Sequence, residues 1–236
     1  METGRKVVVI TGGSQGIGAA LVEAYLGRNY RVVATSRSIK SSDSSDLLTI
    51  SGDIGNPATG PRVIEETLQR FGRVDTLINN AGVFLASSFT HYTAEDYVRA
   101  VATNLTGFFF ATQAAIAAME RQAGGHVVNI TTSLVKQASS KVPSVLASLT
   151  KGGADAATRS LAIEYARSGI RVNAVSPGVI RTPMHAPETY ERLAALHPLG
   201  RLGEISDIVG AVLYLEDAAF VTGETLHVDG GQSAGH

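Results

Sequence analysis

The sequence predicts a single α/β domain built on a doubly wound parallel sheet with helices on both faces. Short β-branched runs alternate with longer segments of helical periodicity, and this alternation requires crossover connections between parallel strands. The expected strands are apolar throughout, as in a sheet that is covered on both faces. Of the 236 residues, 44% are hydrophobic and 17% are charged, which favours a packed globular domain over disorder.

The individual elements follow from these patterns in chain order. Apolar runs that end at glycine or polar residues predict the strands 7–11, 31–35, 47–50, 76–79, 126–131, 171–176 and 225–228. Apolar residues at helical spacing predict the helices 17–27, 63–71, 94–120, 145–166 and 205–216. No linker divides the chain, so we expect residues 1–236 to form one domain. The segment 183–202 has three prolines and no clear strand, which indicates a substrate flap with a short helix near 190–196.

Composition and charge argue against several classes of function. The 20 basic and 21 acidic residues give a net charge of −1, which removes the usual electrostatic case for binding nucleic acid or an anionic membrane. The chain has no cysteine and no close-paired histidines, so we expect no disulfide, no cysteine nucleophile and no metal site. No apolar run has the length of a signal-peptide core or a membrane span, which favours a soluble cytoplasmic protein.

A glycine-rich turn after the first strand predicts a dinucleotide site. Gly12, Gly16 and Gly18 follow a Gly-x-x-x-Gly-x-Gly spacing between that strand and an apolar helix. The first glycine permits a tight turn, the second a close approach to a pyrophosphate, and the third close packing of helix on strand. The free amides and positive end of the helix N-terminus favour an anion there. A purely structural turn is the alternative interpretation.

The end of the second strand predicts NADP(H) in preference to NAD(H). NAD-binding proteins usually carry an acidic residue there, which accepts hydrogen bonds from the ribose hydroxyls. Here the strand is followed by Ser36 and Arg37, with no acid. A guanidinium suits a 2′-phosphate, although a solvated surface arginine is the alternative. Asp53, which follows the third strand, could accept from an adenine amino group.

Together these motifs resemble the short-chain dehydrogenase/reductase (SDR) family over nearly the entire chain. The motifs that carry the resemblance are TGGSQGIG at 11–18, Asp53, NNAG at 79–82, Asn104, NITTS at 129–133, Lys151, PGVIRT at 177–182 and VDGG at 228–231. Several of them are common peptides, but their order and spacing are specific. The resemblance implies one Rossmann-like domain, hydride transfer between NAD(P) and an alcohol or carbonyl, and a homotetramer.

The resemblance also implies roles for individual residues. Lys151 would hold the nicotinamide ribose, Asn104 would position Lys151, and Ser133 or Thr132 would bind the substrate oxygen. Cofactor contacts are implied for a larger set: Gly12, Ser14, Gln15, Gly16, Ile17, Gly18, Ser36, Arg37, Asp53, Ile54, Asn79, Asn80, Ala81, Gly82, Lys151, Pro177, Gly178, Val179, Ile180 and Thr182. For each polar member of these sets, the alternative is a helix cap or a hydrogen bond in the core.

The sequence departs from the family pattern at the proton donor. The family carries a tyrosine four residues before the lysine, one helical turn away, and Ala147 stands there in this chain. Alanine cannot donate a proton to a developing alkoxide, a contribution worth roughly 10²–10⁴-fold in rate. His185 ranks first as a replacement because imidazole titrates near neutral pH, although a neutral histidine in the core or on the surface is the alternative interpretation. The other groups considered are Ser144, Ser148, Tyr190 and His197.

Two classes of function therefore remain open. The first is an NADP(H)-dependent oxidoreductase with an altered acid/base, acting on a small carbonyl, alcohol or imine-like substrate. An iminium accepts hydride without needing a proton at oxygen, so it would not require the tyrosine. The second is a catalytically silent NADP-binding sensor or scaffold. The presence of both Asn104 and Lys151 favours the enzyme.

Overall fold

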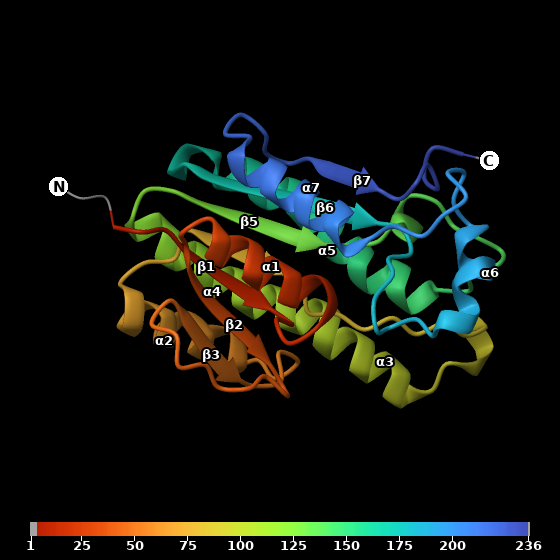
Figure 1. Cartoon of the computed structure of the whole chain (residues 1–236), viewed down its shortest axis with the longest axis horizontal. Helices are drawn as coiled ribbons and strands as arrows, with labels where there is room; N and C mark the ends of the chain where they lie inside the picture. The colour runs from red at the N-terminus through yellow and green to blue at the C-terminus, as the bar shows by residue number, and fades with distance from the viewer. Residues whose placement is uncertain (1–3, 236) are drawn as a thin grey trace.

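The structure, a computed structural model, describes residues 4–235 (Figure 1). These residues contain a seven-stranded, fully parallel sheet of order β3-β2-β1-β4-β5-β6-β7. The strands are β1 (Val7–Thr11), β2 (Arg31–Ser36), β3 (Leu47–Ser51), β4 (Thr76–Asn79), β5 (Gly125–Ile130), β6 (Ile170–Pro177) and β7 (Thr225–Val228). All seven expected strands are present, which confirms the predicted doubly wound fold. The strand order reverses between β1 and β4, where such sheets form a ligand-binding crevice at their carboxyl ends.

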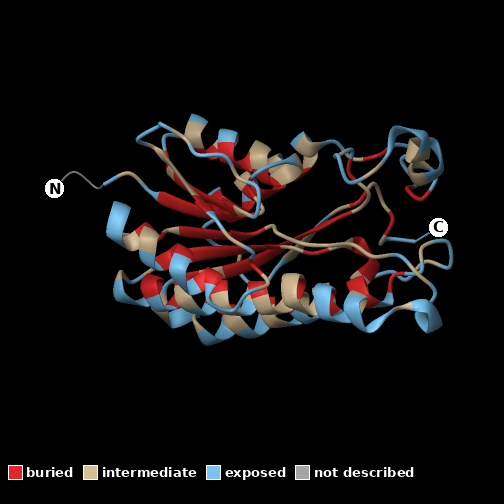
Figure 2. Ribbon diagram, turned by 90° about the horizontal axis from the view of Figure 1, so that it is seen from below, coloured by how far each residue is buried: buried red, intermediate tan, exposed pale blue. Residues whose placement is uncertain are grey.

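Helices cover both faces of the sheet, so the strands are buried between two helical layers (Figure 2). One apolar core lies between the sheet and the pair α1 and α7, and the other lies under α2, α4 and α5. The helix bounds are α1 (Gly16–Gly27), α2 (Thr59–Phe71), α3 (Ala94–Val101), α4 (Gly107–Arg121), α5 (Val145–Glu164), α6 (Tyr190–Ala194) and α7 (Ile205–Asp217).

The single helix expected over 94–120 is interrupted. A π-helical turn, Ala102–Thr106, separates α3 from α4 and contains Asn104. Apolar residues continue on both sides of the turn, so the hydrophobic pattern did not reveal the widened backbone. The whole helical run, Ala94–Arg121, has the length and apolar content of a membrane span by composition. In the fold, much of this apolar surface of α4 packs into the core through residues such as Ala115 and Met119.

The segment between β6 and α7 forms a loop whose two ends lie side by side. A parallel bridge pairs Ile180 with Gly203, so the two ends of the segment 183–202 lie close together. Within it, a 3-10 turn (Pro187–Thr189) leads into α6, as expected from the short helical pattern. This loop emerges from the carboxyl end of β6, on the side of the sheet where the crevice lies.

A buried polar cluster occupies the opposite, amino ends of the strands. The carboxylate of Glu216 on α7 accepts hydrogen bonds from the hydroxyls of Tyr25, Tyr30 and Thr76, at 3.1–3.3 Å. It also lies 3.0 Å from Nδ1 of His126. Burial opposes the charge, but the hydrogen bonds outweigh burial and lower the pKa of Glu216 to about 2. Burial lowers the pKa of His126, so the imidazole is neutral and donates from Nδ1.

Candidate functional site

A cavity of about 380 Å³ opens at the carboxyl ends of the strands. Its walls come from the segments that follow β1 to β6, which the parallel topology brings to one edge of the sheet. Every residue expected to contact the cofactor lines this cavity, with the exception of Asn79. Ser133 and His185, from the expected catalytic set, line it as well.

The glycine turn has the geometry that a phosphate site requires. Gly12 has φ +70°, and α1 begins at Gly16, so the N-terminus of the helix opens toward the cavity. The amides of Gly12 and Gly13 donate to the carbonyl oxygen of Thr35 at 2.8 and 3.2 Å, which fixes the turn against β2. A Cβ atom on Gly18 would overlap the carbonyl oxygen of Gly12, so only glycine allows this close approach. The residues present therefore fit a dinucleotide.

The part of the cavity beside the ends of β2 and β3 carries one cationic side chain and one acidic side chain. Ser36 and Arg37 line it directly after β2, and the Arg37 side chain is exposed. Asp53 is the only carboxylate among the described lining residues. Its Oδ1 accepts from the amide of Gly55 at 2.9 Å, which leaves Oδ2 available to a ligand.

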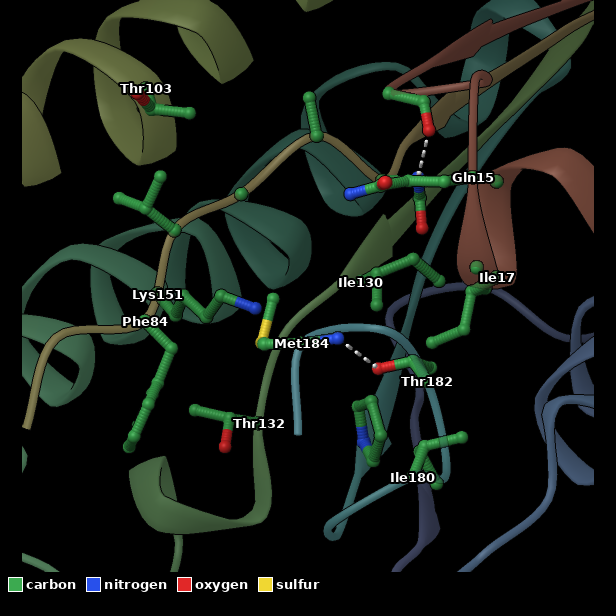
Figure 3. Close-up of a pocket in the computed structure, with 18 of the residues that line it drawn as sticks. Gln15, Ile17, Phe84, Thr103, Ile130, Thr132, Lys151, Ile180, Thr182 and Met184 are labelled. Carbon is green, nitrogen blue, oxygen red and sulfur yellow. Dashed lines mark hydrogen bonds between the residues drawn. The ribbon is translucent and has the colours of Figure 1, made fainter. Parts of the chain in front are cut away.

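Lys151 on α5 enters the cavity from the other end, close to the carboxyl end of β5. Its Nζ donates to the carbonyl oxygen of Thr131 at 3.0 Å, and an ammonium retains two further donors. Burial lowers the pKa of Lys151 to about 8. Figure 3 shows Lys151, Thr132 and Met184 directed toward the same cavity from three separate parts of the chain.

Asn104 lies beside Lys151, but its polar contacts are with other residues. Its Nδ2 donates to the carbonyl oxygen of Val83 and to Oγ1 of Thr150, both at 3.0 Å. Its Oδ1 accepts from the Val83 amide at 2.9 Å. A small cavity of about 20 Å³ touches both Asn104 and Lys151 and has room for one water molecule. The π-helical turn thus ties α3 and α4 to the loop that follows β4.

Asn79 does not line the cofactor cavity, but it braces the central sheet, which is the other role that the resemblance implied for it. Its side chain is buried within the fold, and its Nδ2 donates to Thr112 and Asn129, both at 2.9 Å. The neighbouring Asn80 lines the cavity instead and holds the turn by donating to the carbonyl oxygens of Thr11 and Gly12. The strand register, which a short motif does not reveal, decides which of the two adjacent asparagines faces the site.

Ala147 lies one turn before Lys151 on α5. It is buried, and it does not line the cavity. Of the two nearby serines, Ser144 is buried outside the cavity lining, and Ser148 donates to the carbonyl oxygen of Leu134 at 3.2 Å. Neither hydroxyl reaches the cavity.

The aromatic side chains in the segment 183–202 differ in where they lie. The guanidinium of Arg181 lies 5.0 Å from the ring centroid of Tyr190, which is outside the cavity lining. His197 is buried, and its Nε2 accepts from the Val179 amide at 2.9 Å. His185 lines the cavity, and partial burial lowers its pKa. Of the five groups considered as replacement donors, only His185 reaches the cavity.

Ser133 has a partner that sequence reasoning missed. Its hydroxyl donates to Oε1 of Gln232 at 2.8 Å, and both side chains are buried. We expected this hydroxyl to face the substrate oxygen, but its proton is directed to the C-terminal segment instead. Gln232 lines the cavity, although no motif in the sequence marked it. Apolar residues that also line the cavity and were not singled out in advance are Val83, Phe84, Leu134, Val142, Met184, Leu193 and Leu196.

Comparison with known proteins identifies the family. A family model described as enoyl-(acyl carrier protein) reductase matches residues 12–233. The chain belongs to the SDR family. This SDR is 35% identical over 232 residues to the human 3-oxoacyl-acyl-carrier-protein reductase, a match that covers 96% of this chain and 97% of the relative. It is 37% identical over 245 residues to a 3alpha-hydroxysteroid dehydrogenase of Mediterraneibacter gnavus, covering 95% and 96%.

Solved structures extend the likeness to the fold. The structure described as ElxO with NADP bound superposes on this SDR with a TM-score of 0.91 at 30% identity, covering 98% of this chain and 100% of the other. A second structure, of a point variant of ElxO with NADPH bound, matches equally well. The protein is therefore an oxidoreductase of the SDR type, and its structural neighbours include NADP-bound proteins.

Proposed function

We propose that this SDR is an NADP(H)-dependent oxidoreductase that interconverts a small carbonyl or imine-like group and its reduced form, using an acid/base other than the family tyrosine. One observation carries the proposal. A single cavity is lined both by the phosphate turn and Arg37 and by Lys151 and His185. This arrangement suits a long anionic cofactor whose reactive end lies beside a titratable group.

The cofactor-binding part of the proposal rests on charge and geometry. The N-terminus of α1 offers amides to the pyrophosphate, and the guanidinium of Arg37 offers a charged fork to a 2′-phosphate. The two remaining donors of Lys151 suit the nicotinamide ribose hydroxyls. When bound, NADPH supplies the hydride, and the chain must hold it in place and manage the proton. The preference for NADP(H) over NAD(H) follows from the lack of an acid at the end of β2.

His185 is the proposed proton donor. It is the titratable imidazole in the cavity lining, whereas Ser144, Ser148, Tyr190 and His197 have other surroundings. It belongs to the segment 183–202, which we infer to act as a flap over the substrate, because Met184, Leu193 and Leu196 of this segment add an apolar wall. The proton would pass from the imidazolium to the oxygen or nitrogen that hydride transfer makes basic.

A catalytically silent NADP-binding protein is the second candidate. Ala147 is buried, and neither Ser144 nor Ser148 brings a hydroxyl to the cavity from the same helix, which favours the silent protein.

The cytoplasmic location suggested by the sequence remains a prediction, which fractionation of expressing cells tests.

Steady-state oxidation of NADPH against a panel of ketones, quinones, aldehydes and imines tests the proposal. The enzyme should oxidise NADPH with at least one class, and His185→Ala should reduce kcat at least tenfold while NADPH affinity stays unchanged. His91→Ala is the matched control, because His91 is exposed and lies outside the cavity lining. Tight NADPH binding with no turnover across the panel would favour the silent protein. Full activity in His185→Ala would exclude His185 as the acid.

A further inference from the structure

The C-terminal segment is folded in a way that delivers one side chain to the cavity. After β7, the carboxylate of Asp229 accepts from the amides of Gly231 and Ser233 at 3.0 and 2.9 Å. The amide of Gln232 donates to the carbonyl oxygen of Asp229 at 3.1 Å, and Gly231 has φ +91°, which favours glycine. This tight turn directs Gln232 away from the sheet edge and onto Ser133.

The contact with Ser133 determines what each group can still do. The Ser133 hydroxyl has one proton, which it donates to Oε1 of Gln232, so toward a ligand its oxygen can only accept. The side-chain nitrogen of Gln232, Nε2, has two protons and donates neither of them to a residue among 4–235. This nitrogen is not buried without a partner, and Gln232 lines the cavity, so Nε2 is accessible to a ligand there. The cavity therefore contains an amide donor adjacent to a hydroxyl acceptor.

We propose that Gln232 binds the substrate oxygen through its amide N–H, while Ser133 acts as an acceptor beside it. The inference rests on the proposed oxidoreductase function and names a binding group for it. A carbonyl oxygen would accept from Gln232 alone. The corresponding alcohol would accept from Gln232 and also donate its own proton to Ser133. The pair thus favours the hydroxyl-bearing partner of the reaction, the alcohol, over the carbonyl.

Gln232 does not supply the proton for carbonyl reduction. An amide N–H stabilises negative charge on the oxygen by hydrogen bonding and remains bonded throughout. The proton that converts the alkoxide into the alcohol still comes from the acid, which the proposed function assigns to His185. Gln232 acts on the same oxygen but stays neutral, so its effect must be separable from that of the acid.

The competing explanation is that Gln232 only holds Ser133 and the C-terminal turn in place. Two substitutions separate the explanations. Gln232→Glu keeps an acceptor of the same length for Ser133 but removes the amide donor and places a negative charge near the developing alkoxide. Gln232→Ala removes both functions and frees the Ser133 hydroxyl to donate to the substrate. Ser233→Ala is the matched control, because Ser233 follows Gln232 in the same turn and lies outside the cavity lining.

The experiment compares kcat/KM for the most active carbonyl substrate of the panel at pH 8, together with the Kd for NADPH and the melting temperature. We expect Gln232→Glu to lose at least tenfold in kcat/KM and to fall below Gln232→Ala. Ser233→Ala should match the parent, and NADPH affinity should stay within twofold in all three. As the pH falls, the ratio of parent activity to Gln232→Glu activity should decrease toward one, because the new carboxyl group regains a hydrogen-bond donor when it is protonated.

Three outcomes would overturn the proposal. If Gln232→Glu retains parental activity while Gln232→Ala loses it, Gln232 only supports Ser133. If both variants match the parent, the side chain does not contact the substrate. If the parent binds NADPH but turns over no member of the panel, the proposed function itself fails, and the substrate role falls with it. The first two results leave the oxidoreductase function intact, so failure of the Gln232 role can be distinguished from failure of the proposed function.

Discussion

Our proposal assigns the choice between NADPH and NADH to the two residues that follow β2. Ser36 and Arg37 line the cavity where an acid would otherwise bind ribose hydroxyls. We expect Arg37→Ala to weaken NADPH binding about tenfold, or about 1.4 kcal/mol, and to leave NADH binding nearly unchanged. Ser36→Asp should shift the preference toward NADH, because the new carboxylate repels a 2′-phosphate. Nicotinamide fluorescence titrations with both cofactors measure these changes. Equal parental affinities for the two would show that the end of β2 does not select the phosphate.

The proposed acid predicts a specific pH dependence. Burial lowers the pKa of His185 below its usual value near 6.5, so the imidazolium becomes the main form only below that pH. Reduction needs the protonated form, and its rate should therefore rise as the pH falls below about 6.5. Oxidation of the alcohol needs the neutral form and should show the opposite trend. The pH profile of kcat in each direction measures this, and His185→Ala should remove the pH dependence in both directions.

The cluster around Glu216 joins α7 to the amino ends of the strands. Glu216→Ala removes the common acceptor of Tyr25, Tyr30 and Thr76, so we expect a loss of about 3 kcal/mol or more in the free energy of unfolding. NADPH affinity should persist, because the cofactor cavity lies at the other ends of the strands. Urea unfolding and fluorescence titration provide the two measurements. A parallel loss of stability and of cofactor affinity would contradict this separation.

The same cluster predicts the direction of acid sensitivity. The folded-state pKa of Glu216, about 2, lies below its unfolded value, so its stabilising contribution is complete above about pH 4.5 and is lost as the pH falls toward 2. His126 is buried in the neutral form and binds a proton more readily when unfolded, which adds to the loss below pH 6.5. The melting temperature of the parent should therefore fall more steeply with acid than that of Glu216→Gln.

The sequence allowed the elements to be predicted where one local pattern decides them. Apolar β-branched runs bounded by polar residues located all seven strands, because a doubly covered sheet leaves little polar surface on its strands. The π-helical turn at 102–106 was missed, since the apolar residues continue across it. Most of the residues expected to contact the cofactor line one cavity, because they directly follow predicted strands whose carboxyl ends meet at one edge of the sheet. Gln232 could not be predicted, because its position depends on a turn formed around Asp229 and on contact with a serine 99 residues away.

Assembly belongs to the scale of the whole molecule. The outer surfaces of α4 and α5 expose Phe109, Leu149 and Ile163, at 54%, 56% and 79% exposure, and Phe220 near β7 is fully exposed. Large apolar side chains on small-residue helices suit burial between subunits, so the expected homotetramer remains our prediction. Light scattering at micromolar concentration should report four chains. Leu149→Glu together with Ile163→Glu should produce smaller species, and a stable monomer in the parent would exclude the assembly.

The central claim is that this SDR retains a complete cofactor site and lacks only the family proton donor. Ala147→Tyr tests it most directly, because a phenol there would lie one turn from the Lys151 ammonium, which lowers the pKa of the phenol. Ala147→Phe is the matched control that fills the same space without a hydroxyl.

The measurement is NADPH oxidation with a simple ketone by the parent and both variants. We predict a gain of at least tenfold in kcat for Ala147→Tyr, no gain for Ala147→Phe, and an unchanged Kd for NADPH in all three. Rapid ketone turnover by the parent, with no gain in a folded, NADPH-binding Ala147→Tyr enzyme, would contradict the account.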